Sequence, residues 1–393
     1  MCRDTPTSQL QAQESNTPQP LPLDPLHFKE SDTIGHPLLT PKPSNTFRLY
    51  MQNPNGISVG DTGDMPKLLA DLKAAQVDLY MGPETKLDTA NSQRAVTACC
   101  KKAHNKLVRH VQCCSGISIS GTHKPGGVIS ILTGNNTGRV YECGSDDFGR
   151  WVYMKLNGGS GRQLTFITTY QVGPKSVKDV KSSTAIAQQY SRHEQAKREH
   201  PHRLRWHHSK DLVTYVKQCQ AAGELVIVGG DFNETLGEDA GGMTRLCTEC
   251  GLLDPAFETH GHTNFKTHIN GSKVIDYVLL DPELMTAVEA CGYEHFQARM
   301  NSDHRGLYID VTESLFFGNA TLSPATPPAR SYNSKSTKQT LDYYEHMERH
   351  LKAHNWFQKI QTLQQCINSG QPNHQLADEL DRRRIAANTQ RIH

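Results

Sequence analysis

Five short polar clusters stand at the ends of stretches that we predict to be β-strands, where a scaffold exposes functional side chains. Their side chains are carboxylates, amides, a phenol and an imidazole, the groups that bind hard cations, position water and move protons. The clusters are Gln52-Asn53-Pro54-Asn55-Gly56, Pro83-Glu84-Thr85, Tyr170-Gln171, Gly230-Asp231-Phe232-Asn233 and Ser302-Asp303-His304. A further acid, Asp276, lies inside the apolar run 274–279, where burying a carboxylate is costly unless it is paired.

Each cluster alone also fits a structural role. Asn-Pro-Asn-Gly is typical of a turn, Asp-Phe-Asn of a helix cap, and a glutamate after a strand is usually solvated. Together they supply what hydrolysis of a phosphodiester needs: carboxylates for a cation, a group that positions water, and donors for the charge that develops on the phosphate. The candidate set is Asn53, Glu84, Tyr170, Asp231, Asn233, Asp276, Asp303 and His304.

Short apolar runs alternate with turn residues and amphipathic stretches between residues 46 and 313, which predicts both strands and helices. The expected strands cover residues 47–51, 77–81, 127–132, 151–156, 164–170, 225–228, 274–279 and 307–311. One helix is expected to begin at Asp64-Met65-Pro66, and a long one to cover about 180–220. We therefore predict an α/β (α+β) fold, a four-layer sandwich in which two mostly antiparallel β-sheets pack face to face with helices outside.

Composition divides the chain into four parts. Residues 1–45 hold eight of the 20 prolines and few aromatics, so we expect them to be disordered. Residues 46–313 form the predicted catalytic domain, and the Pro/Ser/Thr-rich residues 314–335 form a linker. In residues 336–393, apolar side chains recur at helical spacing from 341 to 367, which predicts one or two amphipathic helices that offer a surface to a protein partner.

Composition also excludes several classes of protein. Lys+Arg 42 against Asp+Glu 40 gives a net charge of +2, too small for a globally basic nucleic-acid coat protein. Eleven cysteines in 393 residues are too sparse for a disulfide scaffold. No apolar run reaches the roughly 18 residues of a membrane span, and the first residues lack the apolar core of a secretory signal. We expect an intracellular protein, neither secreted nor bound to a membrane, with nuclear and cytoplasmic locations both open.

Six motifs follow one another along residues 46–313: QNPNGI, PET, TTYQV, VIVGGDFNE, SKVIDYVLL and NSDHRGL. In this order they resemble the endonuclease/exonuclease/phosphatase superfamily, which includes DNase I and the apurinic endonucleases, and they are most similar to the endonuclease modules of LINE-type retroelements. The resemblance implies a DNA endonuclease that depends on Mg²⁺, with Mn²⁺ as the alternative cofactor. RNA stays open as a substrate. A phosphomonoesterase or RNA exonuclease on the same fold, and a non-catalytic, decayed interaction module, stay open as functions.

The resemblance also implies a metal site. Glu84 would be the principal Mg²⁺ ligand, with Asn53 beside it and Asp303 close to the metal. Two positions depart from the family, because many relatives have Gln where Pro83 stands and Pro where Val172 stands. Pro83 lacks a backbone donor and a side-chain amide next to the metal ligand, which bears on the rate rather than on the class of reaction.

The remaining roles implied by the resemblance concern water and phosphate. Asp231 would orient or deprotonate the attacking water, while Asn233 and Tyr170 would contact the phosphate. His304 would stabilise the developing charge or act as acid and base, and Asp276 would fix its tautomer.

A basic stretch at residues 191–210 carries six Lys or Arg against two Glu. It is either a solvated helix face or a track for nucleic-acid phosphates, because spaced cations supply the counterion-release part of binding. The candidates for phosphate contacts are Arg192, Arg198, Arg203, Arg205 and Lys210, with a weaker group at Lys101, Lys102, Lys106 and Arg109.

Cys247 and Cys250, with His260 and His262 downstream, could be drawn as a zinc site. One Cys-x-x-Cys without a second well-spaced pair is a weak signal, and the same residues fit the packing face of a helix. We favour the packing interpretation.

Overall fold

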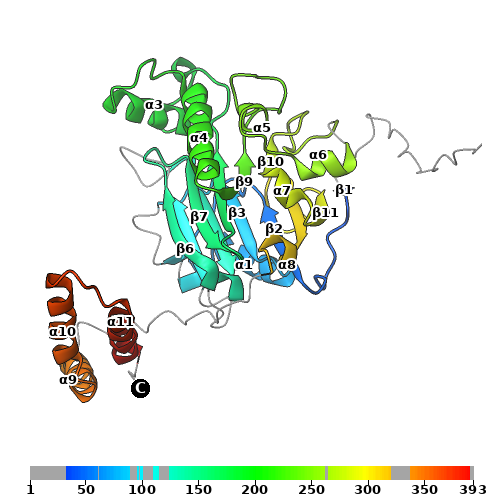
Figure 1. Ribbon diagram of the computed structural model, residues 1–393. Coiled ribbons are helices and arrows are strands. Elements are labelled where there is room, and N and C mark those ends of the chain that lie inside the picture. The colour runs from blue at the N-terminus through cyan, green and yellow to red at the C-terminus, as the bar shows by residue number, and fades with distance from the viewer. Residues whose placement is uncertain are drawn as a thin grey trace, which may run out of the picture.

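The computed structural model describes residues 32–60, 62–88, 95–96, 98–100, 109–114, 124–261, 264–319 and 337–389. Two β-sheets pack face to face, and helices lie on both outer sides (Figure 1). The predicted α/β fold, a four-layer sandwich, is therefore confirmed.

The two sheets differ in size. The larger has seven strands in the order β1 (Ile34–Gly35), β11 (Val288–Tyr293), β12 (Leu307–Thr312), β2 (Thr46–Met51), β3 (Leu79–Pro83), β5 (Val128–Thr133) and β4 (Arg109–Cys114). The smaller has five, in the order β10 (Asp276–Leu280), β9 (Glu224–Asp231), β8 (Gln163–Tyr170), β7 (Trp151–Asn157) and β6 (Val140–Ser145). The pairs β2/β3 and β8/β9 are parallel, and the other strand pairs of the described residues are antiparallel, as predicted.

Apolar side chains from both sheets fill the space between them. Phe47 of β2 faces Phe166 of β8 with ring centroids 6.2 Å apart, and both are buried. At Gly229 in β9 a Cβ would lie 2.9 Å from the Sδ atom of Met81 in β3, so glycine allows the sheets to approach closely here. Burying this apolar surface is the main force that docks the sheets.

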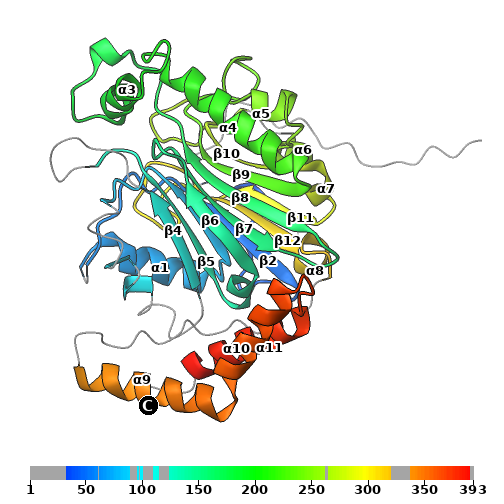
Figure 2. The same cartoon turned by 60° about the vertical axis from the view of Figure 1, so that its left-hand side comes forward.

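Helices cover the two outer faces (Figure 2). Helix α1 (Asp64–Ala74) packs Met65, Leu68, Leu69 and Leu72 against the larger sheet. Helix α4 (Leu204–Ala221) packs on β9 of the smaller sheet, and α3 (Ala185–Gln195) precedes it. The shorter helices are η1 (Asn135–Arg139), η2 (Val177–Asp179), α5 (Arg245–Thr248), α6 (Pro255–His260), α7 (Pro282–Met285) and α8 (Glu313–Phe316).

The single long helix that we predicted over about 180–220 is wrong, because α3 and α4 are separate helices. The interruption contains Pro201, which lacks a backbone N–H, and Lys197 and His200 have left-handed φ angles of 52° and 51°. The break lets the second helix change direction.

The sandwich extends beyond residues 46–313 at both ends. Residues 32–45 belong to the predicted disordered segment, yet Ile34 is buried and β1 pairs with β11. Residues 314–319 belong to the predicted linker, yet Phe316 and Phe317 are buried against Phe47. Both predictions missed short apolar groups within polar sequence; residues 1–31 and 320–336 lie outside the described residues.

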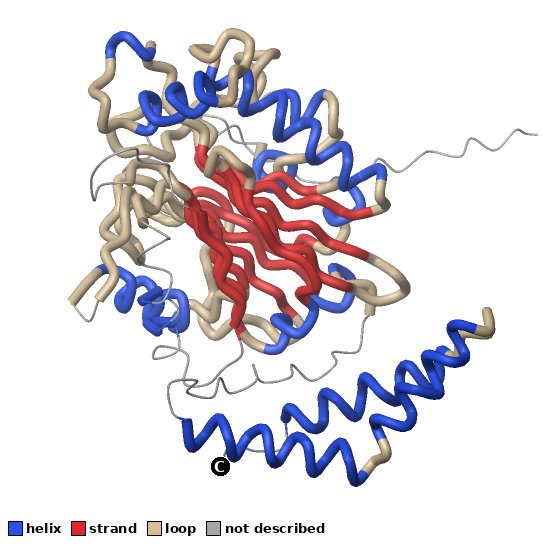
Figure 3. Tube along the Cα trace, turned by 90° about the vertical axis from the view of Figure 1, so that its left-hand side faces the viewer, coloured by secondary structure: helices blue, strands red, loops and turns tan. Residues whose placement is uncertain are grey.

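The C-terminal part contains three helices rather than the one or two predicted: α9 (Thr337–Ala353), α10 (Trp356–Asn368) and α11 (His374–Thr389) (Figure 3). They pack on one another, with the Trp356 indole donating to the Leu380 carbonyl at 3.0 Å. Leu341 and Ile367 remain 57% and 53% exposed. In the described part of the chain, no helix is long and apolar enough to span a bilayer.

Candidate active site

One end of the sandwich gathers all eight side chains of the candidate set. On the larger sheet, Asn53 and Glu84 follow the parallel strands β2 and β3, and His304 precedes β12, which runs antiparallel to β2. On the smaller sheet, Asp231 ends β9 and pairs with Asp276, the first residue of β10. These strand ends lie at the same end of the sandwich, so side chains from both sheets meet there and the two sheets contribute about equally to the site.

Asn53 lies at the centre of the cluster and is fully buried. Its amide nitrogen donates to Asp231 Oδ2 at 2.9 Å and to Glu84 Oε2 at 3.1 Å, and lies 3.3 Å from His304 Nε2. Its amide oxygen accepts from the Asn55 backbone N–H at 2.7 Å. Asn53 therefore links the predicted metal ligand, the predicted base and the histidine.

His304 and Asp276 form a buried pair. The Nδ1 atom of His304 lies 2.8 Å from Asp276 Oδ2, and the two residues are 5% and 0% exposed. A carboxylate at this distance accepts a hydrogen bond from the Nδ1–H group, which leaves Nε2 facing Asp231 Oδ2 and Asp303 Oδ1, each 4.0 Å away. The geometry is that of an imidazole whose tautomer is fixed by an acid.

Burial and neighbouring charges shift the titration of this cluster. Burial and the charge of Asp276 raise the pKa of Asp231 well above its usual range. Burial lowers the pKa of His304, but the carboxylates of Asp276, Asp231 and Asp303 raise it by more, so the net shift is upward. Both shifts favour the protonated form, so this cluster binds protons more tightly than the isolated side chains would.

Glu84 occupies a constrained turn after β3. Its φ angle is +52°, in the left-handed region that a residue with a side chain rarely adopts. Backbone hydrogen bonds hold the turn: Gly56 N–H donates to the Glu84 carbonyl at 2.9 Å, and Thr85 N–H donates to Gly127 O at 3.0 Å. Such a conformation persists where the surroundings fix it, and it is common at functional sites.

The donor set fits a hard divalent cation. Glu84 and Asp303 each offer a carboxylate, and Asn53 would offer its amide oxygen after a turn of the amide group, whose nitrogen faces Glu84 in this structure. The Asp303 Oδ1 atom is buried and has no hydrogen-bond partner among the described residues, as expected for an acceptor that serves a ligand. These three residues would hold a Mg²⁺ ion through oxygen atoms.

Two residues that sequence reasoning did not single out contact Asp303. Asn55 donates to Asp303 Oδ2 at 3.0 Å, and His268 Nε2 lies 3.2 Å from the same atom. The His268 ring also packs edge-on against His304, with centroids 4.8 Å apart. Asn55 stands within the first of the six motifs, whereas His268 carried no signal because it is 35 residues away in sequence from its partner.

Tyr170 and Asn233 lie on the side of the smaller sheet. Burial and the charges of Glu84 and Asp231 raise the pKa of the Tyr170 hydroxyl, which therefore stays protonated. Asn233 has a φ of +48°, and its amide donates to the Gln171 carbonyl at 2.8 Å and to Asp231 Oδ2 at 3.2 Å. Its amide nitrogen is thus held beside the predicted base.

A cavity of about 460 Å³ opens beside Glu84 and Tyr170. Its lining includes Lys175 and Lys181, which lie in the segment between β8 and α3, together with apolar residues. Sequence reasoning did not include either lysine, although both precede the basic stretch by only 10 to 20 residues. They place positive charge next to the predicted metal ligand.

The basic candidates divide into two groups. Arg198 pairs with Asp211 at 2.6 Å, and Arg205 pairs with Glu234 at 2.6 Å, so both have structural partners. Arg205 also donates to the Asn233 carbonyl at 3.1 Å, which connects α4 to the site.

The other candidates contact no carboxylate within the described part of the chain. Arg192 donates to the Asp147 carbonyl at 3.4 Å, while Arg203 and Lys210 flank the half-buried Trp206 ring at 5.5 and 4.8 Å. Lys101, Lys102 and Lys106 lie outside the described residues, and Arg109 is in β4 with its side chain undescribed.

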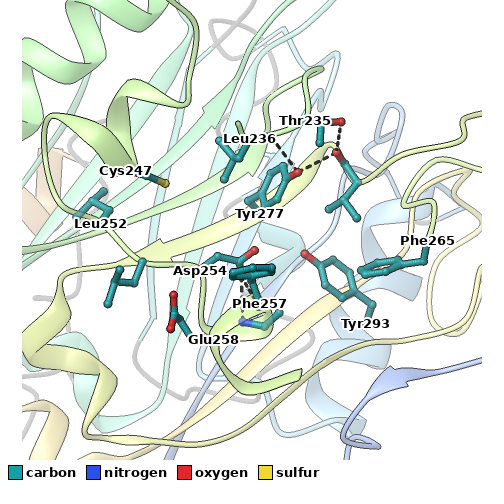
Figure 4. Close-up of a pocket in the computed structure, with 13 residues that line it drawn as sticks. Thr235, Leu236, Cys247, Leu252, Asp254, Phe257, Glu258, Phe265, Tyr277 and Tyr293 are labelled. Atoms are coloured by element: carbon teal, nitrogen blue, oxygen red, sulfur yellow. Dashed lines mark hydrogen bonds between the residues drawn. The ribbon is translucent and has the colours of Figure 1, made fainter. Parts of the chain in front are cut away.

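A separate, largely apolar pocket of about 340 Å³ is lined by residues that include Asp254, Tyr277 and Tyr293 (Figure 4). The Tyr293 hydroxyl, on its wall, donates to the Asp276 carbonyl at 2.9 Å. Asp254 caps helix α6 by accepting from the Ala256 backbone N–H at 2.9 Å, and burial raises the pKa of this carboxyl to about 6. The pocket thus adjoins the backbone that positions Asp276.

The structure does not bring the suggested zinc ligands together. Cys250 is buried in the apolar core and Cys247 packs against it, in agreement with the packing interpretation. His260 instead lies next to Cys291, with its Nε2 atom 3.8 Å from the sulfur. His262 lies outside the described residues.

Comparison with known proteins gives structural matches alone. No family model matches the chain, and no curated protein matches it in sequence. Solved structures that are similar include an AP endonuclease from Leishmania major, with a TM-score of 0.48, 13% identity, and coverage of 72% of this chain and 93% of that one. A 3′ phosphatase from Neisseria, solved with a product DNA hairpin, has a TM-score of 0.47 and 15% identity, and covers 67% and 99%.

The endonuclease domain of TRAS1, a telomere-specific non-LTR retrotransposon, is also similar, with a TM-score of 0.42, 11% identity, and coverage of 68% and 98%. Each of these similarities is one of structure, at a sequence identity of 15% or less. At TM-scores below 0.5, the chemistry has to be inferred from the side chains of the site itself.

Proposed function

We propose that this protein is a Mg²⁺-dependent hydrolase of phosphodiesters, with DNA cleaved internally as its principal reaction. The observation that supports this proposal best is the single hydrogen-bonded cluster in which Asn53 connects Glu84, Asp231 and His304. It combines oxygen ligands for a cation, an acid and base pair, and donors around one small volume. The order of the sequence motifs favours a retroelement-type endonuclease within this class.

The metal side of the site is Glu84, Asn53 and Asp303. A divalent cation bound there supplies positive charge that offsets the charge developing on the phosphate. The left-handed turn at Glu84 fixes its carboxylate in advance, so little ordering is left for the moment of binding.

The proton-transfer side is Asp231, His304 and Asp276. With the proton on His304, Asp231 is ionised and accepts a proton from the attacking water, and its raised pKa makes it a better base than an exposed aspartate. His304, with Nδ1 held by Asp276, directs Nε2 to the phosphate and donates a hydrogen bond or proton there. Tyr170 would donate to a remaining phosphate oxygen, and Asn233 would do so by giving up one of the hydrogen bonds that its amide nitrogen donates to Gln171 and Asp231.

A polynucleotide substrate requires cations that contact phosphates beyond the scissile one. Lys175 and Lys181 line the cavity beside Glu84, and Arg203 and Lys210 contact no carboxylate among the described residues. These four side chains form a better candidate track than the ion-paired Arg198 and Arg205.

The test is a nicking assay on supercoiled plasmid with the full chain, in Mg²⁺ and in EDTA. His304→Ala should abolish nicking, while His374→Ala, which removes an exposed histidine of α11, should leave it unchanged. Parallel assays with single-stranded RNA and with a 3′-phosphorylated oligonucleotide decide between the open alternatives. Equal activity of the His304→Ala variant and the wild type would contradict the proposal, and so would the absence of any metal-dependent phosphoester hydrolysis.

A further inference from the structure

Three metal-binding side chains meet at the β1 edge of the larger sheet. His36 follows β1, His260 is the last residue of α6, and Cys291 lies in β11. One nitrogen or sulfur atom from each lies within 4.8 Å of the other two. None of these residues belongs to the candidate active site.

The spacing is close to that of a coordinated ion. The sulfur of Cys291 lies 3.8 Å from His260 Nε2, and the two imidazole rings have centroids 4.6 Å apart at an angle of 69°. In a tetrahedral zinc site, bonds of about 2.3 Å to sulfur and about 2.0 Å to nitrogen place these atoms roughly 3.5 Å apart. Shifts of well under 1 Å would bring the sulfur and His260 to that distance.

The backbone around the cluster is shaped to admit the His260 ring. At Gly35 a Cβ would lie 2.6 Å from His260 Nε2, and the φ angle of +82° also favours glycine. The His36 N–H donates to the Cys291 carbonyl at 3.0 Å, and the Tyr308 hydroxyl donates to the His36 carbonyl at 3.0 Å. The three side chains are therefore presented from a fixed framework.

We propose that Cys291, His260 and His36 bind a Zn²⁺ ion, with water as the fourth ligand. The Cys291 S–H bond breaks, a Zn–S bond forms, and the proton passes to solvent. The His260 proton passes through solvent from Nε2 to Nδ1, so Nε2 gives up the hydrogen bond that it donates to the Cys291 carbonyl, 2.9 Å away, and binds the metal with its free electron pair. Sulfur and imidazole ligands select Zn²⁺ over Mg²⁺ and Ca²⁺, which prefer oxygen.

The bound ion would join three segments that are distant in sequence. Strand β1 has two residues and pairs on one side, with β11, so few backbone hydrogen bonds hold it. Coordination by His36 would fasten this edge to α6 and β11, and the site would stabilise the fold without taking part in hydrolysis. Burial raises the pKa of the Cys291 thiol to about 11, so the thiol is inert until a cation displaces its proton.

The experiment uses the full chain, reduced, stripped with EDTA and dialysed. Co²⁺ replaces Zn²⁺ as the probe, because a thiolate ligand gives a sulfur-to-cobalt charge-transfer band that the nitrogen and oxygen ligands of the active site cannot give. One equivalent of Co²⁺ should produce the band, and Zn²⁺ should displace it. Cys291→Ser should abolish the band, whereas Cys250→Ser, which alters another buried cysteine, should keep it.

Affinity and thermal stability provide a second measurement. Loss of a mere partner of a metal ligand costs about 10–100-fold in affinity, so His36→Gln should weaken Zn²⁺ binding by more than about 100-fold. Zn²⁺ should raise the melting temperature of the wild type and of His268→Gln, the control for binding at the active site, but not that of His36→Gln. Equal melting temperatures of wild type and His36→Gln in EDTA establish that the variant folds.

Three results would overturn the proposal. The first is the absence of a charge-transfer band in the wild type, and the second is a band that survives Cys291→Ser. The third is an equal rise in melting temperature with Zn²⁺ in wild type and His36→Gln. Each can be read whether or not the protein cleaves DNA.

Discussion

Replacing Asp276 by asparagine tests whether this residue positions the His304 ring for activity or mainly contributes to the unfolding free energy. The asparagine oxygen can still accept from His304 Nδ1, but the hydrogen bond, 2.8 Å long, loses the charge of the carboxylate. A hydrogen bond to a charged group contributes about 1.5–3 kcal/mol. A neutral hydrogen bond still contributes about 0.5–1.5 kcal/mol, so the net loss is about 1–1.5 kcal/mol, and at 1.36 kcal/mol per tenfold change kcat should fall roughly 5- to 13-fold.

The same change should cost the fold little. Asp276→Asn removes one of the two carboxylates that face the His304 imidazole in this buried group, and with it the repulsion that helps to raise the pKa of Asp231. Asp231 Oδ2, 4.0 Å from His304 Nε2, still compensates the imidazolium. Removing one partner of an isolated buried ion pair costs about 3–5 kcal/mol, and we expect Asp276→Asn to avoid this loss.

The assay pairs plasmid nicking in Mg²⁺ with urea unfolding of the same preparations. Combining Asp276→Asn with His304→Ala should reduce nicking little more than His304→Ala alone, because the two side chains act as a unit. Additive losses in this cycle would refute the positioning role. An unfolding free energy lower by about 3 kcal/mol or more would refute the charge argument.

Further predictions concern the metal ligand, a helix cap and the basic lining of the cavity. Glu84→Gln should lower nicking by orders of magnitude while circular dichroism stays unchanged, and undiminished activity at low Mg²⁺ would count against Glu84 as a ligand. The pKa of Asp254 is about 6 in the folded protein, above its unfolded value, so ionisation of this carboxyl lowers the stability of the fold as pH rises from about 4 to about 6. Asp254→Asn keeps the helix cap and should add up to about 3 kcal/mol to the unfolding free energy at pH 7.5 but little at pH 4. An equal gain at both pH values would exclude the buried charge as the cause. The double variant Lys175→Glu, Lys181→Glu should flatten the plot of log binding constant for DNA against log salt concentration, by about 0.9 in slope for each phosphate that the two lysines neutralise in the wild type. The control Lys352→Glu in α9 should leave the slope unchanged. An unchanged slope in the double variant would show that the two lysines do not belong to the binding surface.

The sequence was sufficient to predict the strands that carry the site, because each is a continuous apolar run that ends at a polar cluster. Besides the two-residue β1, which lies in the segment expected to be disordered, β4, β6 and β11 were not predicted. Their sequences, RHVQCC, VYECGS and VEACGY, mix charged, glycine and cysteine residues. Strands with such mixed composition lack the alternation that a sequence pattern detects, and tertiary packing decides their conformation.

For the site, residue types and their order predicted the eight candidates that the structure brings together, although their roles remain to be tested. What could not be predicted is which charges pair. Arg198 and Arg205 had the spacing of a phosphate track, yet Asp211 and Glu234 neutralise them from 13 and 29 residues away. The contact of His268 with Asp303 likewise depends on how a loop folds back over the strand ends.

The position of β12 has a consequence for the timing of activity during synthesis. This strand is made after every other strand of the sandwich, yet it lies inside the larger sheet, between β11 and β2. Its arrival also brings His304 to Asn53, 251 residues earlier in the chain. A nascent chain that has not yet released residue 312 from the ribosome therefore has β2 unpaired on one side and no complete catalytic cluster. Under the proposed function, a chain built in this way is inactive until this domain is finished, and a truncated product is left with an open sheet edge that favours aggregation over cleavage.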